Sequence, residues 1–466
     1  MPLPKEFVDE PLLTLARDRS VAFLRGLPER YVGARASRAE IMAALDVPLS
    51  DEGDDPAAVI DSMASQAERA AIASAGPRYF GFVIGGSLPV ALAADWLTSA
   101  WDQNCGIFAT SPLASVAEEV ARGWLLDLLG LPATASVGFV TGCQMANFTC
   151  LAAARYAALR KAGWNVEEQG LPGAPAVNLV VGAETHVTIL TSMRMLGFGT
   201  KALIAVPTDG EGRVRADELR RVLDSLDGPT IVCAQAGNVN TGAIDPLRDV
   251  IAAAHERDAW LHVDGAFGLW AGASRTKRSL LDGVDGADSW ATDAHKWLNV
   301  PYDSGLAIVR DPVAHRASMT VSAAYLEQTA GAERDPVDWG PEFSRRGRGF
   351  PIYAALRALG RHGVEELVDR GCACARRMAE RLIANSRVEL LNDVVLNQVL
   401  VRFLPPAGGD IDAYTRDVVA RVQKDGTCWL AGTTWHEMAA MRISFSSWAT
   451  TEEDVDRSAA AILGAL

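Results

Sequence analysis

Short apolar runs separated by helical stretches occupy the middle of the chain. The runs are bounded by polar or small residues and cover positions 178–181, 203–206, 230–234, 259–263 and 305–309. Runs of this length suit strands that are buried on both faces of a sheet, and the stretches between them suit crossover helices. The pattern therefore predicts an α/β fold with a mainly parallel sheet, in which ligands bind beyond the carboxyl ends of the strands.

The N-terminal part of the chain follows a different pattern. Apolar residues recur with helical spacing over about 8–27, and the pair Asp55-Pro56 is typical of a helix start, because proline suits the first turn. Neither helix has a neighbouring strand to pack on. We expect residues 1–76 to form a helical arm.

The C-terminal part predicts a smaller unit. After Pro351, helical patterns near 352–361 and 365–384 precede apolar strands at 398–403 and 441–445. This order is typical of a small α+β domain. We therefore expect a large α/β domain at 77–350 and a small domain at 351–466.

Composition and charge exclude some classes of protein. The chain has 466 residues, which is too long for one simple core, and a formal net charge of −14, which argues against binding nucleic acid through its phosphates. The short basic cluster Arg345-Arg346-Gly347-Arg348 is expected to form local ion pairs or to anchor a loop.

The sequence also predicts a cytoplasmic protein. No apolar run reaches the roughly 18 residues needed to span a bilayer, and the first ten residues lack a basic region followed by an apolar core. The seven cysteines have no framework spacing, so we expect reduced thiols, and no metal site is predicted.

Three segments carry the candidate chemistry. Lys296 follows a histidine at the end of a short apolar segment, where its amine can form a Schiff base with an aldehyde. Asp264 ends the strand at 259–263 and can keep a pyridine nitrogen protonated. The small-residue turn at 141–147 leads into a helix and can bind a phosphate. Together these segments describe a site for pyridoxal 5′-phosphate.

On these residues the chain resembles the group II pyridoxal-phosphate-dependent amino-acid decarboxylases, the family of the aromatic-amino-acid and glutamate decarboxylases. The resemblance runs from about Pro77 to about Ser447, and further matches lie at 183–186, 236–245, 324–326 and 344–348. It implies a fold type I enzyme with a mainly parallel seven-stranded sheet in the large domain. It also implies a homodimer in which the N-terminal arm wraps the partner; the arm could instead cover its own large domain.

The resemblance assigns roles to the cofactor-site residues. Lys296 would form the Schiff base, Asp264 would bind the ring nitrogen, and Ala266 and His186 would lie against the two ring faces, while the phosphate region and its surroundings would include Gly142, Cys143, Gln144, Asn147, Asn238 and His295. Each has an ordinary structural alternative: a surface lysine, an aspartate that caps a helix, or a histidine in a core or a cap. Burial of Lys296 among tryptophans would lower its pKa toward the neutral amine.

Several positions depart from the family pattern. Cys143 replaces a glycine and Gln144 replaces a hydroxyl residue, although the Gln144 amide can still donate to a phosphate. Asp293 stands where the family often has asparagine, and it would place a carboxylate near the phosphate or cap a backbone turn. Val239 replaces a threonine whose hydroxyl lies beside the cofactor's phenolate oxygen, which leaves the reaction outcome open.

The substrate side is assigned by the same resemblance. Tyr325 matches a loop tyrosine that protonates the carbanion left after carbon dioxide departs; its alternative is packing beside Leu326. Arg442 would hold a substrate carboxylate, or form an internal ion pair with a residue such as Glu437. Aromatic residues would line the side-chain pocket or belong to the core, namely Tyr79, Phe80 and Trp101.

The sequence thus predicts decarboxylation of an L-amino acid, with an aromatic substrate favoured. The same cofactor site also suits a transaminase, an aldehyde-forming oxidative deaminase or a carbon–carbon lyase. A catalytically silent dimer that binds the cofactor is the alternative outside enzymes. The sequence does not name the substrate.

Overall fold

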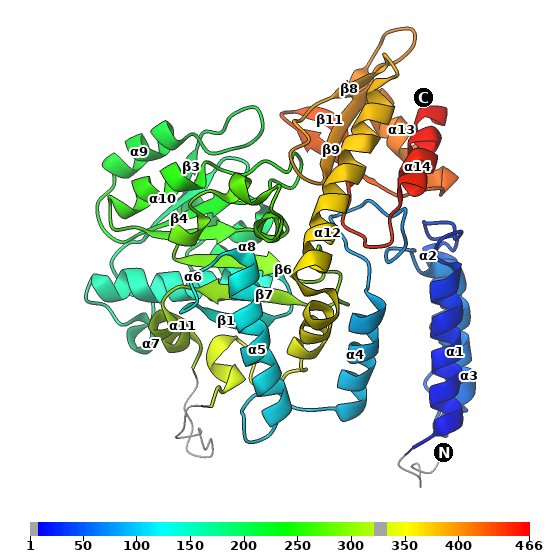
Figure 1. The fold of residues 1–466 in the computed structure, drawn as a ribbon, viewed down its shortest axis with the longest axis horizontal. Helices are drawn as coiled ribbons and strands as arrows, with labels where there is room; N and C mark the ends of the chain where they lie inside the picture. Colours follow the sequence, from blue (N-terminus) through cyan, green and yellow to red (C-terminus); the bar gives the residue numbers. More distant parts are fainter. Residues whose placement is uncertain (1–7, 321–332) are drawn as a thin grey trace.

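The computed structural model describes residues 8–320 and 333–466, and its large domain is an α/β sandwich (Figure 1). The central sheet has seven strands in the order β1-β7-β6-β5-β4-β2-β3. The strands are β1 (Ser136–Val140), β2 (Asn178–Gly182), β3 (Leu203–Val206), β4 (Thr230–Gln235), β5 (Trp260–Asp264), β6 (Ser289–Asp293) and β7 (Gly305–Val309).

The predicted mainly parallel sheet is confirmed. Neighbours from β3 to β6 pair in parallel, and only β7 runs antiparallel to its neighbours β1 and β6. All five runs expected from the sequence are strands, whereas β1 and β6 were not among them. A strand's direction depends on which neighbours it meets, and an apolar run does not encode that choice.

Both faces of the sheet are covered by helices. In β4, Ile231 and Cys233 pack toward one helical layer, and Val232 and Ala234 pack toward the other. The first layer contains α6 (Cys143–Lys161) and α8 (Val187–Met195), with α11 (Pro312–Met319) beside α6. The second contains α5 (Pro112–Leu129), α9 (Ala216–Asp224), α10 (Leu247–His255) and the 3-10 helix η2 (Gly268–Ala273).

The remaining short helices connect these layers. They are α7 (Val166–Gln169), η1 (Thr200–Ala202), η3 (Arg278–Leu281), η4 (Val284–Gly286) and η5 (Pro336–Trp339). No helix within 8–320 or 333–466 combines the length and apolar character that a membrane crossing requires.

The C-terminal unit is an antiparallel sheet with helices on it, as expected. Its strands lie in the order β10-β11-β9-β8 and cover β8 (Val388–Leu390), β9 (Gln398–Phe403), β10 (Ala431–Trp435) and β11 (Met438–Ser444). Helices α13 (Ile411–Asp425) and α14 (Glu452–Gly464) share its core with the end of the long helix α12 (Gly349–Ile383).

Helix α12 joins the two units. The sequence predicts two helices near 352–361 and 365–384; the structure has one element with a break at Gly360, whose φ is +60° and ψ is −174°. A glycine adopts such angles without the steric penalty that a Cβ would bring. Helix α12 runs across position 350, where the large domain is expected to end and the small domain to begin. The expected domain boundaries therefore stay predictions.

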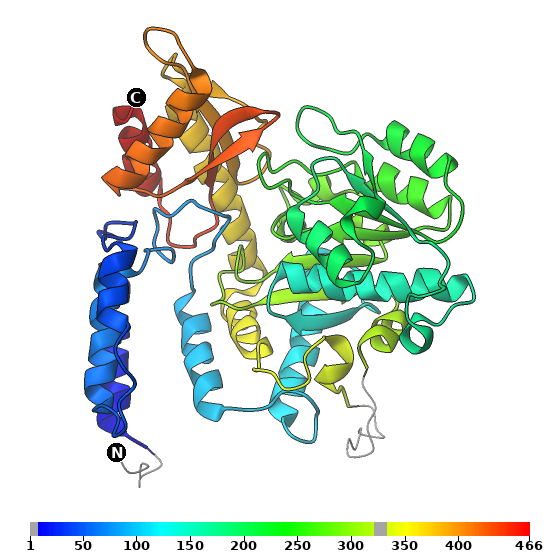
Figure 2. The same ribbon diagram turned by 180° about the vertical axis from the view of Figure 1, so that it is seen from behind.

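The N-terminal arm stands beside the rest of the molecule (Figures 1 and 2). It consists of α1 (Glu10–Gly26), α2 (Arg38–Leu45) and α3 (Pro56–Ala70), and none of the three buries a residue. Asp55 caps α3 and Pro56 begins it, as predicted. Helix α4 (Pro89–Trp101) follows the arm and packs on α12.

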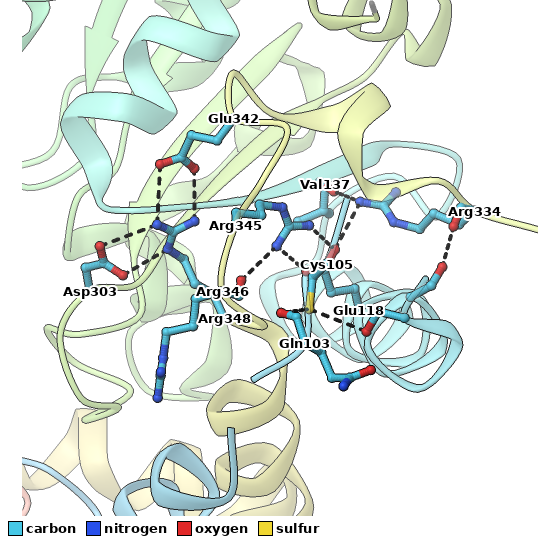
Figure 3. Close-up of polar contacts among 12 residues, drawn as sticks. Gln103, Cys105, Glu118, Val137, Asp303, Arg334, Glu342, Arg345, Arg346 and Arg348 are labelled. Carbon is cyan, nitrogen blue, oxygen red and sulfur yellow. Dashed lines mark hydrogen bonds and ion pairs between the residues drawn. The ribbon is translucent and has the colours of Figure 1, made fainter. Parts of the chain in front are cut away.

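The basic cluster forms local ion pairs, which confirms the expectation from the sequence (Figure 3). Arg345 lies 2.7 Å from the fully buried Glu118 carboxylate, and Arg334 approaches the same carboxylate at 3.9 Å. Arg348 pairs with Asp303 at 2.9 Å. The cluster ties α5 to the segment before α12 and holds the turn that follows Lys296.

Candidate active site

Asp264 lies at the carboxyl end of β5, in the middle of the sheet, and is only 5% exposed. Its carboxylate accepts hydrogen bonds from Asn147 Nδ2 at 3.3 Å, from the Ala266 N–H at 3.2 Å and from Cys143 Sγ at 3.5 Å. These donors come from the start of α6 and from the loop after β5. They fix the direction in which the carboxylate faces.

His262 supports this arrangement from the same strand. Its Nε2 lies 2.9 Å from Asn147 Oδ1, and its Nδ1 lies 2.9 Å from Ser289 Oγ. Complete burial lowers the pKa of His262 to about 4, so the ring is neutral at pH 7. His262 was not among the predicted site residues. Its position two residues before Asp264 was a usable signal, because residues two apart on a strand face the same side.

The turn before α6 approaches a neighbouring strand closely. Gly142 is extended, and a Cβ on Gly305 would lie only 2.5 Å from the Gly142 backbone. A Cβ on Gly142 itself would lie 3.2 Å from His295 Cε1. Only glycine therefore fits at Gly305, and the predicted phosphate turn lies beside His295. The Gln144 side chain is exposed on the first turn of α6.

Asp293 links this turn to Lys296. The Asp293 Oδ1 accepts the Cys143 N–H at 2.5 Å, and Oδ2 lies 3.0 Å from Lys296 Nζ. Burial lowers the pKa of Lys296, but the Asp293 carboxylate, helped by Cys143 and Asp264, raises this pKa above its ordinary value. The expected shift toward the neutral amine was therefore wrong in direction, because the sequence did not reveal the ion pair.

His295 contacts Asp293 directly, whereas His186 interacts with this group only through its charges. His295 Nε2 is 3.4 Å from Asp293 Oδ1, and its ring stacks on Tyr302 at 4.1 Å. His186 caps α8, with Nδ1 2.8 Å from Thr188 Oγ1. Burial lowers the pKa of both histidines, which favours neutral rings. His186 thus caps α8, and its pKa also depends on the charges of Asp264, Lys296 and Arg442.

Arg442 on β11 brings a positive charge from the small domain. It is 8% exposed, and Nη1 lies 3.5 Å from Asn240 Oδ1, while Nε has no hydrogen-bond partner. Within residues 8–320 and 333–466, no carboxylate lies within ion-pairing distance of it. The expected alternative, a pair with Glu437, is not formed; Glu437 is exposed at the turn between β10 and β11.

The predicted aromatic wall is divided between the site and the core. Tyr79 stacks on Trp429 at 5.0 Å, and burial together with nearby Tyr302 raises the pKa of Tyr79 to about 12. Phe80 instead packs on Phe445 in the core of the small domain. Trp101 packs edge-on against Phe350 and is 43% exposed.

Asn238 forms hydrogen bonds within its own loop rather than with the group around Asp264. The Asn238 Oδ1 accepts hydrogen bonds from the N–H groups of Asn240 and Thr241, so this oxygen is used within the turn that begins at Asn238. Tyr325 lies outside the described residues. Tyr302, in contrast, was missed, because nothing in its local sequence signals that it stacks on His295.

These residues fit pyridoxal phosphate, the cofactor expected from the sequence. Asp264 presents a buried carboxylate for a ring nitrogen, and Lys296 presents a buried amine for the aldehyde. Near the turn, Ser304 is 2% exposed and its hydroxyl has no partner in the described structure, which leaves a donor for a phosphate. Asp293 is the one residue whose charge opposes a phosphate there. No group of three or more metal-ligating side chains occurs among the described residues.

Comparison with known proteins identifies the family. A model of the pyridoxal-dependent decarboxylase conserved domain matches residues 39–404. An aromatic-L-amino-acid decarboxylase from Bacillus atrophaeus is 28% identical over 394 residues, which cover 81% of this chain and 78% of that protein. An L-2,4-diaminobutyrate decarboxylase from Rhizobium meliloti is 30% identical over 375 residues, which cover 79% and 73%.

Two other similarities bear on the reaction and the fold. A 4-hydroxyphenylacetaldehyde synthase from Rhodiola rosea is 28% identical over 396 residues, covering 82% of this chain and 79% of that protein. The crystal structure of Oryza sativa TDC with PLP and tryptamine superposes with a TM-score of 0.92 at 24% identity and covers 100% of this chain and 98% of that one. The structural likeness confirms the fold.

Proposed function

The chain belongs to the pyridoxal-dependent decarboxylase family, and from this premise we propose that it decarboxylates an aromatic L-amino acid to the amine. Membership makes the protein a carboxy-lyase that uses pyridoxal 5′-phosphate and acts on an amino acid. The proposal adds the substrate class and the residue roles. The observation that carries the aromatic substrate class is Tyr302, whose ring is 57% exposed and stacks on His295 beside Asp293.

Each residue of the site has a separate task. When bound, pyridoxal phosphate supplies an aldehyde and an electron-withdrawing ring. Lys296 is the residue that bonds to the aldehyde, and Asp264 holds the proton on the ring nitrogen. Asn147 and His262 hold the Asp264 carboxylate in one orientation. By resemblance to the family, His186 and Ala266 would hold the two faces of the ring.

The aromatic substrate is proposed from the residues that flank this site. Tyr302 is 57% exposed beside His295, and Tyr79 lies beside Tyr302. Flat apolar rings of this kind pack against an aromatic side chain in offset or edge-on geometry.

Decarboxylation of an acidic amino acid is the second candidate, and Arg442 is the observation that favours it. A buried guanidinium holds a carboxylate well. If that carboxylate belongs to the substrate's side chain, it remains on the product and the arginine does not stabilise the group that leaves.

The deciding experiment incubates the cofactor-loaded protein with each of the twenty amino acids. Carbon dioxide, amine and aldehyde are all measured. Equal amounts of carbon dioxide and amine from an aromatic substrate support the proposal; turnover of acidic substrates alone would move the assignment to the second candidate. Aldehyde in place of amine would identify an aldehyde-forming enzyme, an outcome that the Val239 substitution keeps open.

We assign proton return to the product carbon to Tyr325, on family resemblance. Tyr325→Phe removes the phenolic proton and preserves the ring, so amine formation should fall on the order of 10²- to 10⁴-fold, the typical loss for a general acid. Carbon dioxide release should fall less than amine formation. Parental amine yield from the variant would instead make Tyr325 a packing residue.

A homodimer is proposed from the uncovered arm. Helices α1 and α3 bury no residue, and α4 also exposes large apolar side chains, including Trp96 at 41% and Leu97 at 50%. A cleft of about 580 Å³ between the arm and α4 is lined mostly by apolar atoms. Such a surface is typical of a protein interface. Deleting residues 1–76 should dissociate or aggregate the protein in sedimentation experiments; a well-behaved active monomer would contradict this role.

A reducing compartment such as the cytoplasm is proposed from the cysteines. All seven are buried free thiols. Proteins of oxidising compartments usually pair their cysteines. Cell fractionation tests the assignment, and recovery of the protein outside the cytoplasm would refute it.

A further inference from the structure

The buried Asp293 carboxylate contacts two groups that the cofactor would also have to contact. Asp293 is 3% exposed at the carboxyl end of β6. Its Oδ1 accepts the Cys143 N–H, the first N–H of α6, at 2.5 Å, and its Oδ2 pairs with Lys296 Nζ at 3.0 Å. Asp293 therefore bridges the start of α6 and the lysine amine.

This place is suited to an anion. The first N–H groups of a helix lack partners within the helix, and the helix dipole favours negative charge there. Gly142 has no side chain to cap α6, so the cap comes from Asp293 on another strand. Beside it, the buried Ser304 hydroxyl has no hydrogen-bond partner in the described part of the chain. The helix N-terminus thus carries one acidic ligand already and has a free donor next to it.

A phosphate at this turn would meet the Asp293 charge. The charged and titratable groups that face Asp293 are Cys143 from α6, Asp264 from β5, His186 at the start of α8, and His295, Lys296 and Tyr302 from its own segment. Of these, Lys296 is the cation in contact with it. Bonding of Lys296 to the aldehyde would replace the ammonium that Asp293 pairs with, and a phosphate at this turn would add negative charge beside the Asp293 carboxylate.

We propose that Asp293 is an internal anion that competes with the cofactor. In the cofactor-free protein it occupies the α6 N-terminus and holds Lys296 as an ammonium ion, and it must give up the Cys143 N–H when a phosphate binds. Asp293 therefore weakens phosphate binding. This inference rests on the proposed function, since it requires pyridoxal phosphate to bind between Asp264 and α6.

The test compares two ligands that lack the aldehyde, so that Lys296 chemistry is removed from the measurement. Pyridoxine 5′-phosphate and pyridoxine are titrated calorimetrically into the cofactor-free parent protein and into Asp293→Asn. Asparagine Oδ1 can still accept the Cys143 N–H, so the helix cap is preserved while the charge is lost. Asp293→Asn should bind pyridoxine 5′-phosphate at least tenfold more tightly than the parent, and its affinity for pyridoxine should be unchanged.

Equal or weaker binding of the phosphate ester by Asp293→Asn would overturn the proposal and make Asp293 a permanent cap. An equal gain for pyridoxine would also overturn it, because the effect would then not arise at the phosphate. If the asparagine variant does not fold, Asp293→Ser, which also removes the charge but has a shorter side chain, gives a second comparison of the two ligands. Failure of both proteins to bind the phosphate ester would refute the cofactor site as well, whereas equal binding by two active proteins refutes this inference alone.

Discussion

Replacing Arg442 by methionine should change substrate binding and folding stability in opposite directions. Arg442 is 8% exposed, its nearest polar partner is Asn240 Oδ1 at 3.5 Å, and burial lowers its pKa. Replacing buried ion pairs by apolar residues of similar volume is often stabilising by about 1–4 kcal/mol, and a lone buried cation has less compensation than a pair. We therefore expect Arg442→Met to raise the free energy of unfolding of the cofactor-free protein by an amount in this range.

The same change should weaken the interaction with a substrate carboxylate. Removing one partner of a buried, hydrogen-bonded charge pair costs about 2–5 kcal/mol. At 1.4 kcal/mol per factor of ten, this is a loss of about 30- to 5,000-fold in kcat/KM. Arg442→Lys keeps the charge but loses the planar two-point contact, so its kcat/KM should lie between those of the parent and the methionine variant.

Urea unfolding of the cofactor-free protein and carbon dioxide release by the loaded enzyme measure the two effects. Arg402 on the adjacent strand β9 provides the matched control, since it is paired with Glu389 and 23% exposed. Arg402→Met should lower stability by no more than about 1 kcal/mol, as for other partly exposed pairs, and should leave kcat/KM unchanged. Unchanged kinetics together with lower stability in Arg442→Met would refute the reasoning and make Arg442 a structural cation.

Three further changes test the structure around the site. Asp264→Ala should retain some bound cofactor, seen by absorbance, but lose most turnover; a parental rate would make Asp264 only a structural acceptor. Glu118→Ala leaves Arg345 buried without its partner and should cost about 3–5 kcal/mol in urea unfolding. The double change Glu118→Ala with Arg345→Met should recover much of this loss, and additive losses would contradict the pairing. The pKa of His262 is about 4 in the folded protein, whereas its ordinary value is 6.5. Between these two pH values the unfolded chain binds a proton that the folded protein does not bind. The free energy of unfolding should therefore decrease as the pH falls from 6.5 toward 4, by about 3 kcal/mol in total. His262→Gln should flatten the urea stability profile across this interval, and an unchanged slope would show that other groups dominate.

The fold class was accessible from the sequence because it depends on local patterns. The runs that became β2, β4 and β5 are mostly apolar since both faces of these strands are covered by helices. Asp55 and Pro56 mark the start of α3 because capping involves residues only a few positions apart. The direction of β7 was not accessible, since it depends on how distant elements pack.

The candidate site, like the fold, could be predicted from the sequence only in part. The lysine, the strand-ending aspartate and the small-residue turn were recognisable as chemical groups in order along the chain. The sequence did not indicate that Phe80 belongs to the small-domain core or that Tyr302 stacks on His295. These facts depend on which rings meet after folding.

By itself, the sequence determined which elements form and which reactive groups the protein carries, because short-range spacing sets burial and capping. Only the tertiary structure decided how those groups affect one another. Cys143 and Asp293 are 150 positions apart, yet their contact places a carboxylate at the start of α6. The same carboxylate pairs with Lys296 and raises its pKa, opposite to the shift expected from burial alone. Electrostatic interactions act through space, so the charge state of the site depends on distances that the order of residues does not contain.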